Sequence, residues 1–152
     1  MRASGGSATA RPPLILAAPA MEIARCAEAD LPHVVRLALR AFAGASRRTV
    51  VETLFGDAVF VAREGGRPVG YIAVAPEDAS LHVHQLVLAA GHERETTGAG
   101  LVAEAERYGV AERVPVLRVR VGKADWTERS FYRRLGFEAV AGELLERALP
   151  VD

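Results

Sequence analysis

Cysteine is almost absent from this sequence, which contains only Cys26 among its 152 residues. A single cysteine excludes a disulfide within the chain. The apolar neighbours of Cys26 favour a buried core thiol over a reactive nucleophile. No cysteine and histidine residues are spaced as ligands of a metal site, so we expect no metal cofactor.

Net charge and long apolar runs are also missing. The 19 basic residues balance the 19 acidic ones, so no overall field favours nucleic acid or an anionic membrane as a partner. No apolar run approaches the ~20 residues that a transmembrane helix needs. The sequence therefore predicts a cytoplasmic protein without nucleic-acid or membrane partners, and its length predicts one domain.

The first twenty residues differ in composition from the rest of the chain. They are rich in Gly, Ser, Ala and Pro, which predicts a disordered tail over residues 1–20. A short apolar run at 14–18 loosely resembles a secretory signal, but the run is too short and follows two prolines. Met21 stands directly before the first strand-like run and is a candidate natural start. The folded domain is expected over residues 21–152.

Short apolar runs and amphipathic helical patterns follow one another along residues 21–152, which predicts an α/β protein with helices on a mixed sheet. The predicted order is β-α-α-β-β-β-α-β-α-β. Strands are expected at 21–27, 58–62, 68–75, 81–88 and 114–121, and the runs 137–140 and 144–149 supply one or two closing strands. Helices are expected to begin at the capping residues Asp30, Ser46 and Asp125 and at Gly98. Trp126, next to the last cap, is expected to pack under its helix start.

The stretch Leu81–Tyr108 joins a strand, a polar loop and a helix that opens with Gly98-Ala99-Gly100. N–H groups at a helix N-terminus bind anions, and glycine lets a bulky phosphate approach the backbone. This arrangement predicts a phosphate site. Residues 98–103 also satisfy the dinucleotide fingerprint Gly-x-Gly-x-x-Gly/Ala. However, about nine polar residues separate them from the strand, and the next strand does not end in an acidic residue, so nicotinamide binding is disfavoured.

Two stretches resemble the GNAT acetyltransferase family. The run His84-Gln85-Leu86-Val87-Leu88, the loop to Gly98 and Leu101-Val102 are similar to the family's strand–loop–helix. The strand Arg118–Val121 and the later run Ser130-Phe131-Tyr132-Arg133-Arg134-Leu135-Gly136-Phe137 resemble its second segment, whose signature is Phe-Tyr-x-x-Leu-Gly-Phe. The likeness in element order extends from about Met21 to Pro150.

The resemblance implies an acetyl-CoA-dependent N-acetyltransferase with a GNAT fold. The strand would splay from its neighbour and offer the backbone of Leu86, Val87 and Leu88 to the pantetheine arm of acetyl-CoA. The pyrophosphate would be held by Arg94, Thr96, Thr97, Gly98, Ala99 and Gly100. Tyr132 would donate a proton to the departing thiolate, a role that suits a phenol with a pKa near 10. The acetyl group would pass directly to an amine of a small molecule or peptide, and homodimers are common in the family.

The polar loop departs from the family pattern Gln/Arg-x-x-Gly-x-Gly/Ala. If Gly98 and Gly100 are the two glycines, Glu95 holds the Gln/Arg position. If helix length is matched instead, Gly98 is the second glycine, Thr96 replaces the first, and Glu93 holds that position. We prefer the second alignment because it keeps the apolar face of the helix. In both, a carboxylate near a phosphate costs about 1–4 kcal/mol, which leaves a ligand-binding or interaction module with weak or no catalysis as the alternative function.

Two histidines are candidate bases for the acceptor amine. His82 and His84 are predicted to share one strand face with Leu86 and Leu88. A branch of the family that acetylates arylalkylamines has His-x-His at a similar place, where it relays a proton from the amine, and neutral imidazole suits that task. Solvent-facing strand histidines are the competing interpretation. Three further carboxylates are candidate bases that nothing in the sequence distinguishes from surface charges, namely Glu52, Glu77 and Asp78.

Overall fold

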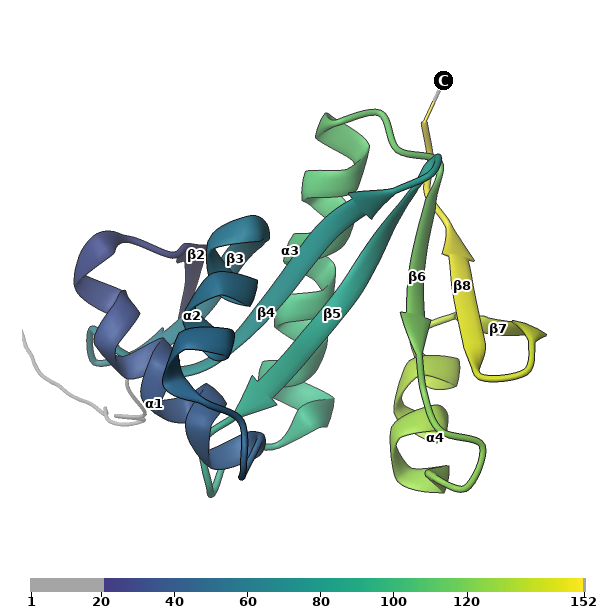
Figure 1. The fold of residues 1–152 in the computed structure, drawn as a ribbon. Helices are drawn as coiled ribbons and strands as arrows, with labels where there is room; N and C mark the ends of the chain where they lie inside the picture. The colour runs from purple at the N-terminus through teal and green to yellow at the C-terminus, as the bar shows by residue number, and fades with distance from the viewer. Residues whose placement is uncertain (1–20, 152) are drawn as a thin grey trace, which may run out of the picture.

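The computed structural model describes residues 21–151, apart from the side chain of Phe55. The tail predicted at residues 1–20 lies outside the described residues. Over the described residues the chain forms one mixed sheet of seven strands in the order β2-β3-β4-β5-β6-β8-β7 (Figure 1). Neighbouring strands are antiparallel except β5 and β6, which are parallel. The predicted α/β class and element order are confirmed, with two closing strands.

The strands are β2 (Met21–Arg25), β3 (Ala58–Glu64), β4 (Arg67–Glu77), β5 (Ser80–Leu88), β6 (Val116–Arg120), β7 (Glu138–Ala141) and β8 (Leu144–Ala148). The helices are α1 (Leu31–Ala41), α2 (Arg47–Gly56), α3 (Ala99–Ala111) and α4 (Trp126–Arg134). A 3-10 turn, η2 (Glu28–Asp30), precedes α1, and a π-helical turn, η3 (Arg94–Gly98), precedes α3.

The sheet separates two apolar cores. One face is covered by α1 and α2, and the other by α3 and α4 (Figure 1). Buried side chains of the first core include Val34, Ala38, Leu54, Val61 and Tyr71. Those of the second include Ile72, Leu101, Leu117, Phe131 and Leu145. Each such side chain stabilises the fold by roughly 1.5–3 kcal/mol relative to exposure, so the two helical layers hold the sheet from both sides.

Local sequence signals set most helix ends. Ser46 caps α2 by accepting a hydrogen bond from the Thr49 N–H at 3.1 Å. Asp125 caps α4 in the same way, through the Glu128 N–H at 3.1 Å. Gly136 follows α4 with φ +96°, a conformation that favours glycine. The predicted caps at Ser46 and Asp125 are confirmed.

The predicted cap at Asp30 is wrong. The 3-10 turn η2 comes directly before α1, so Asp30 already has helical dihedrals and its carboxylate does not cap the helix. The carboxylate instead accepts a hydrogen bond from the Ala27 N–H at 2.8 Å. It also forms two bonds with the Arg63 guanidinium of β3, at 3.0 and 2.6 Å. Asp30 therefore fastens the start of α1 to the sheet.

The predicted shared face of His82, His84, Leu86 and Leu88 is also wrong. In the β4–β5 ladder, Gln85 pairs with Ala73 but Val83 pairs with Val74, which leaves His84 as an extra residue in a β-bulge. The bulge shifts the alternation by one, so Leu86 and Leu88 join the core beside α3 together with the odd-numbered residues Leu81 and Val83. A sequence pattern of period two cannot reveal such an insertion.

Candidate active site

β5 and β6 separate along their length. They pair only over Leu81–Val83 and Leu117–Val119, and from His84 onward β5 has no partner on that side. Figure 1 shows the two strands meeting at one end and diverging toward α4. A bulge bends the strand that carries it, and the bulge at His84 lies where the separation begins. The backbone of Leu86–Leu88 pairs with β4 on one edge and leaves its other edge free.

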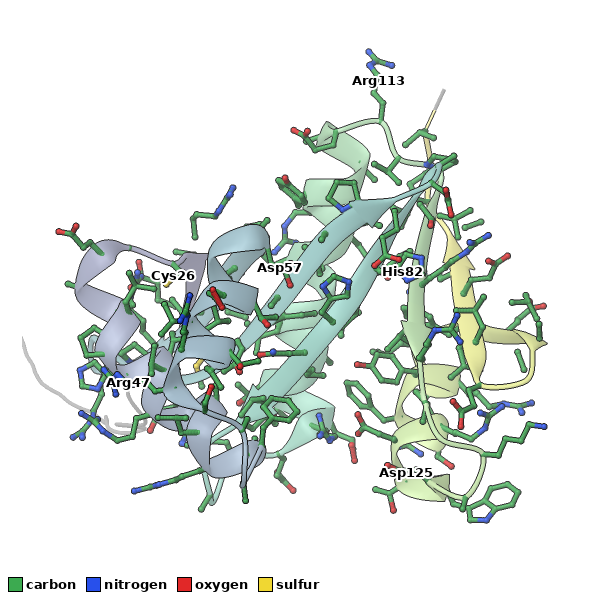
Figure 2. All side chains as sticks on the ribbon, in the orientation of Figure 1. Cys26, Arg47, Asp57, His82, Arg113 and Asp125 are labelled. Carbon is green, nitrogen blue, oxygen red and sulfur yellow. The ribbon has the colours of Figure 1, made fainter. Side chains whose placement is uncertain are left out.

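The opening between β5 and α4 contains a cleft of ≈ 540 Å³. Its walls bring together residues of the first motif and residues at the start of α4, the helix that carries the second motif. The lining side chains and backbone include Phe42, His84, Leu86, Val87, Leu88, Arg94, Asp125, Thr127 and Glu128. Figure 2 shows Asp125 at the start of α4, on the far side of the opening from α1 and α2. Trp126 does not pack under the helix start as predicted, since it is 75% exposed.

Tyr132 lies on the buried face of α4. It is 1% exposed, and its ring makes edge contacts with Phe131 and Phe137, at 4.9 and 5.2 Å between centroids. Burial raises the pKa of the phenol, the Glu128 carboxylate raises it further, and Arg94 opposes both. A raised pKa keeps the phenol protonated, as a proton donor must be. Its role as the acid stays a prediction.

His84 is held between two carboxylates. Its Nδ1 lies 2.9 Å from Asp57 Oδ2, and its Nε2 lies 2.7 Å from Glu77 Oε2. Burial alone would lower the pKa of the imidazole, but the hydrogen bonds to Glu77 and Asp57 outweigh it and the pKa is raised. Both ring nitrogens are donors only in the imidazolium form, so this arrangement favours a charged His84.

Sequence reasoning missed Asp57, because it stands 27 residues from His84 and belongs to no motif. Figure 2 shows it beside α2, and His82 farther along β5 near β6. His82 is half-buried, opposite Arg118 of β6. Of the candidate carboxylates, only Glu77 joins the cluster: Glu52 pairs with Arg48 along α2 at 3.5 Å, and Asp78 forms the β4–β5 turn.

The predicted phosphate loop is a π-helical turn continuous with α3. The N–H groups of Thr96, Thr97 and Gly98 all point to the Glu93 carbonyl, at 3.3, 3.0 and 3.4 Å. The N–H groups left for an anion are therefore those of the turn's first residues. Contact of Thr96, Thr97 and Gly98 with a cofactor stays a prediction.

Gly98 and Gly100 allow α3 to pack closely against its neighbours. A Cβ at Gly98 would lie 3.3 Å from the Phe131 ring of α4. A Cβ at Gly100 would lie 2.6 Å from Ile23 of β2. Ala99 lies between them and packs partly buried against the α3-side core. Close packing explains why both positions are glycine. Their contact with a cofactor stays a prediction.

Arg94 crosses from η3 to α4 inside the cleft. Its Nε lies 2.7 Å from Glu128 Oε1, and its guanidinium carbon lies 5.9 Å from the centre of the Phe131 ring. Its Nη1 is buried without a hydrogen-bond partner among the described residues. Burial raises the pKa of Glu128, Arg94 opposes this rise, and Asp125 adds to it.

The carboxylates that the sequence places near a phosphate, Glu93 and Glu95, are both exposed. Glu95 pairs with Arg134 of α4 at 3.4 Å, also at the surface. The carboxylates that line the cleft are Asp125, predicted only as a helix cap, and Glu128, which stands at the third helix position after that cap. Its contact with Arg94, 34 residues away, could not be found from local pattern.

No helix within residues 21–151 is long and apolar enough to cross a membrane. These residues also hold no group of three or more His, Cys, Asp or Glu side chains placed to bind a metal ion.

Comparison with known proteins places this architecture. The family model described as "Acetyltransferase (GNAT) domain" matches residues 31–150. Among solved structures, ribosomal-protein-alanine N-acetyltransferase from Brucella melitensis is 20% identical, with a TM-score of 0.72 over 84% of this chain and 99% of that one. A GNAT family acetyltransferase from Elizabethkingia anophelis with acetyl-CoA bound is 15% identical, with a TM-score of 0.71 over 85% and 98%.

A third similar structure is the PaiA N-acetyltransferase from Thermoplasma acidophilum in complex with coenzyme A. It is 18% identical, with a TM-score of 0.68 over 85% of this chain and 99% of that one. No curated protein matches the sequence significantly. At these identities the solved structures show a shared fold, and the family model shows the family.

Proposed function

Because the chain belongs to the GNAT acetyltransferase family, we propose that it transfers the acetyl group of acetyl-CoA directly to an amine of a small molecule or peptide. The observation that carries this proposal is the separation of β5 from β6 beyond Val83, which leaves the backbone of Leu86–Leu88 free along a cleft wall. The acetyl-CoA and coenzyme A in two similar structures support the choice of donor.

The residues of the cleft fit an acyl-CoA. A free strand edge offers N–H and C=O groups to the amides of a pantetheine arm, as an added strand would. Arg94 offers a buried Nη1 without a partner, a donor suited to a phosphate oxygen. Glu128 is the one lining carboxylate that already binds this guanidinium.

The chemistry divides between His84, which lines the cleft from β5, and Tyr132, on the buried face of α4. Acetyl-CoA supplies an activated acetyl thioester. As the acceptor nitrogen bonds to the carbonyl carbon and the C–S bond breaks, Tyr132 gives its hydroxyl proton to the sulfur. When the half-exposed Glu77 gives up Nε2, neutral His84 takes there the proton that the acceptor amine loses, and Asp57 at Nδ1 stabilises the imidazolium produced.

A second candidate function is a ligand-binding or interaction module with weak or no turnover. The Arg94–Glu128 pair favours it, because it places a carboxylate in the cleft where an anionic cofactor would lie. The Phe-Tyr-x-x-Leu-Gly-Phe signature is complete in this chain and its Tyr132 is buried, which favours the enzyme.

Two successive measurements test these functions. Acetyl-CoA at 100 times its Kd should stabilise the protein by ~2.7 kcal/mol, a rise in Tm of about 8 °C. Release of free CoA thiol is then followed with a panel of amines and peptides that have free N-termini. No shift in Tm at millimolar acetyl-CoA contradicts the acetyltransferase. A shift without thiol release for any acceptor supports the module.

A further inference from the structure

We infer that Glu128 competes with the phosphate groups of the cofactor for the Arg94 guanidinium. It binds Arg94 in the ligand-free cleft, and a phosphate that takes over Arg94 leaves the Glu128 carboxylate without a cation, so that Glu128 takes up a proton on binding. The inference rests on the proposed function, because the phosphate is that of CoA.

The contact between Glu128 and Arg94 leaves donors of Arg94 available to a second anion. A single ion-pair contact, between Arg94 Nε and Glu128 Oε1 at 2.7 Å, joins the two side chains. Guanidinium has donors on three nitrogens, and the buried Nη1 has no partner among the described residues. The guanidinium carbon lies 5.9 Å from the centre of the Phe131 ring, a cation–π distance that helps to hold the side chain at the cleft. Arg94 can therefore meet a second anion before it leaves the first.

The position of Glu128 follows from the start of α4. In a capping box, the Glu three residues after the cap turns back to the backbone N–H of the cap residue. Here Asp125 accepts the Glu128 N–H, but the Glu128 side chain reaches across the cleft to η3 instead. Glu128 also stands four residues before Tyr132, on the same helix face. The carboxylate thus lies between the predicted acid and the predicted phosphate ligand.

The charged groups around Glu128 decide its protonation. Arg94 faces it from η3, Asp125 and Tyr132 come from α4, and His84 lines the same cleft from β5. Burial and Asp125 both raise the pKa of Glu128, and Arg94 is the charge that lowers it. When a phosphate neutralises Arg94, the pKa rises further. CoA affinity is then highest below the free-state pKa, falls as the pH rises between the free and bound values, and is constant above them.

Proton uptake can be measured on the unaltered protein. We expect calorimetric titration of CoA, in two buffers of different ionisation enthalpy, to show proton uptake of up to one per CoA that varies with pH. Glu128→Gln keeps the shape and removes the charge, so the part of the uptake that belongs to Glu128 should vanish. At a pH where Glu128 is charged, the variant should bind CoA about tenfold more tightly or better. Subtracting the variant's pH profile removes the ligand's own phosphate ionisation near pH 6.

Two controls separate charge from shape. Glu104→Gln makes the same substitution in a Glu–Arg pair on α3, where Glu104 binds Arg107 at 2.6 Å, and it should change neither CoA affinity nor proton uptake. Pantetheine lacks the phosphates, so Glu128→Gln should leave the affinity for pantetheine unchanged. Relief of a steric block would instead raise the affinity for both pantetheine and CoA.

The outcomes distinguish this inference from the proposed function. If CoA binds neither the unaltered protein nor Glu128→Gln at millimolar concentration, the acetyl-CoA function itself fails. If CoA binds both with equal affinity and equal proton uptake, the function stands and the competition is disproved. Binding by the variant alone supports the competition and contradicts the acetyl-CoA function of the unaltered protein.

Discussion

Tyr132 combines a ring fixed by two aromatic neighbours with a hydroxyl influenced by the charges of Glu128 and Arg94. Tyr132→Phe removes the hydroxyl and keeps the packing, so it isolates the proton donor. We expect kcat to fall by about 10²-fold or more, the range for loss of a general acid, while the Kd of acetyl-CoA and the Tm change little. Steady-state kinetics and calorimetry measure these quantities.

Tyr108 provides the matched control for this substitution. It lies on α3, in edge contact with Phe60 at 5.4 Å between centroids, away from the residues that line the cleft. Tyr108→Phe should leave kcat unchanged. An undiminished kcat in Tyr132→Phe would remove the phenol from its proposed role, whatever the control shows.

The carboxylates around His84 should set the pH dependence of turnover. A base must be neutral, and the pKa of His84 is raised above 6.5, so kcat/KM should rise with pH through that higher value. Asp57→Asn removes one of the two carboxylates, lowers the pKa, and should move the rising limb to lower pH. Profiles of kcat/KM from about pH 5.5 to 9 measure the shift.

Asp78→Asn is the control for this pH shift, since Asp78 lies in the β4–β5 turn with φ +51°, a conformation that Asn tolerates. Its profile should match that of the unaltered protein. If the limb stays in place in Asp57→Asn, then His84 is not the base that limits turnover.

At the level of elements, β5 depends on close packing at Gly70. A Cβ there would lie 2.7 Å from Leu88 Cδ2 and 3.1 Å from the Val87 carbonyl. Gly70→Ala should therefore destabilise the protein by about 1–3 kcal/mol and weaken acetyl-CoA binding, because it displaces the strand edge proposed to hold pantetheine. Urea unfolding and calorimetry measure the two effects.

Gly100→Ala is the natural comparison. Its Cβ would meet only the flexible end of Ile23, at 2.6 Å, and alanine is favoured over glycine in a helix by roughly 1 kcal/mol. We expect a near-neutral or stabilising effect on folding. Weaker acetyl-CoA binding in a well-folded Gly100→Ala protein would support the predicted contact of this glycine with the pyrophosphate, and an unchanged Kd would contradict that contact.

Element types were predictable from sequence, whereas the irregularities that shape the cleft were not. Ser46 and Asp125 cap their helices through bonds three residues away, a distance that a local pattern covers. The bulge at His84 adds one residue to β5 relative to β4, and it is visible only in the pairing of these two strands. The turn Arg94–Gly98 is π-helical, and it is recognised only from its hydrogen bonds to the Glu93 carbonyl.

At the level of the whole molecule, contacts between distant residues hold the layers together, and the sequence does not show them. The family signature located α4 and Tyr132, because its residues are contiguous. It could not locate Asp57 beside His84 or Glu128 beside Arg94, since each pair joins different elements. The cleft residues missed from sequence are therefore those whose partners come from across the fold.

Asp30 and Arg63 form another such pair, which ties the helical layer to the sheet. Their side chains are 7% and 14% exposed and share two bonds, at 3.0 and 2.6 Å. Asp30→Asn should lower the free energy of unfolding by about 1.5–3 kcal/mol, since it removes a charged hydrogen-bond partner of Arg63 and leaves the exposed Glu22, at 3.3 Å, as the carboxylate beside it. Glu52→Gln, in the exposed pair with Arg48, should cost less than about 0.5 kcal/mol.

The pH dependence of this loss identifies its origin. The hydrogen bond from Arg63 lowers the pKa of Asp30, against the opposing effect of burial. The unfolded value is near 3.9, so the stabilisation is complete above about pH 4 and is lost as the pH falls through the lower folded value. Urea unfolding at a series of pH values should show a constant gap between the unaltered protein and Asp30→Asn near neutrality and a narrowing gap below about pH 4. A gap that stays constant into acid would assign the loss to packing and not to charge.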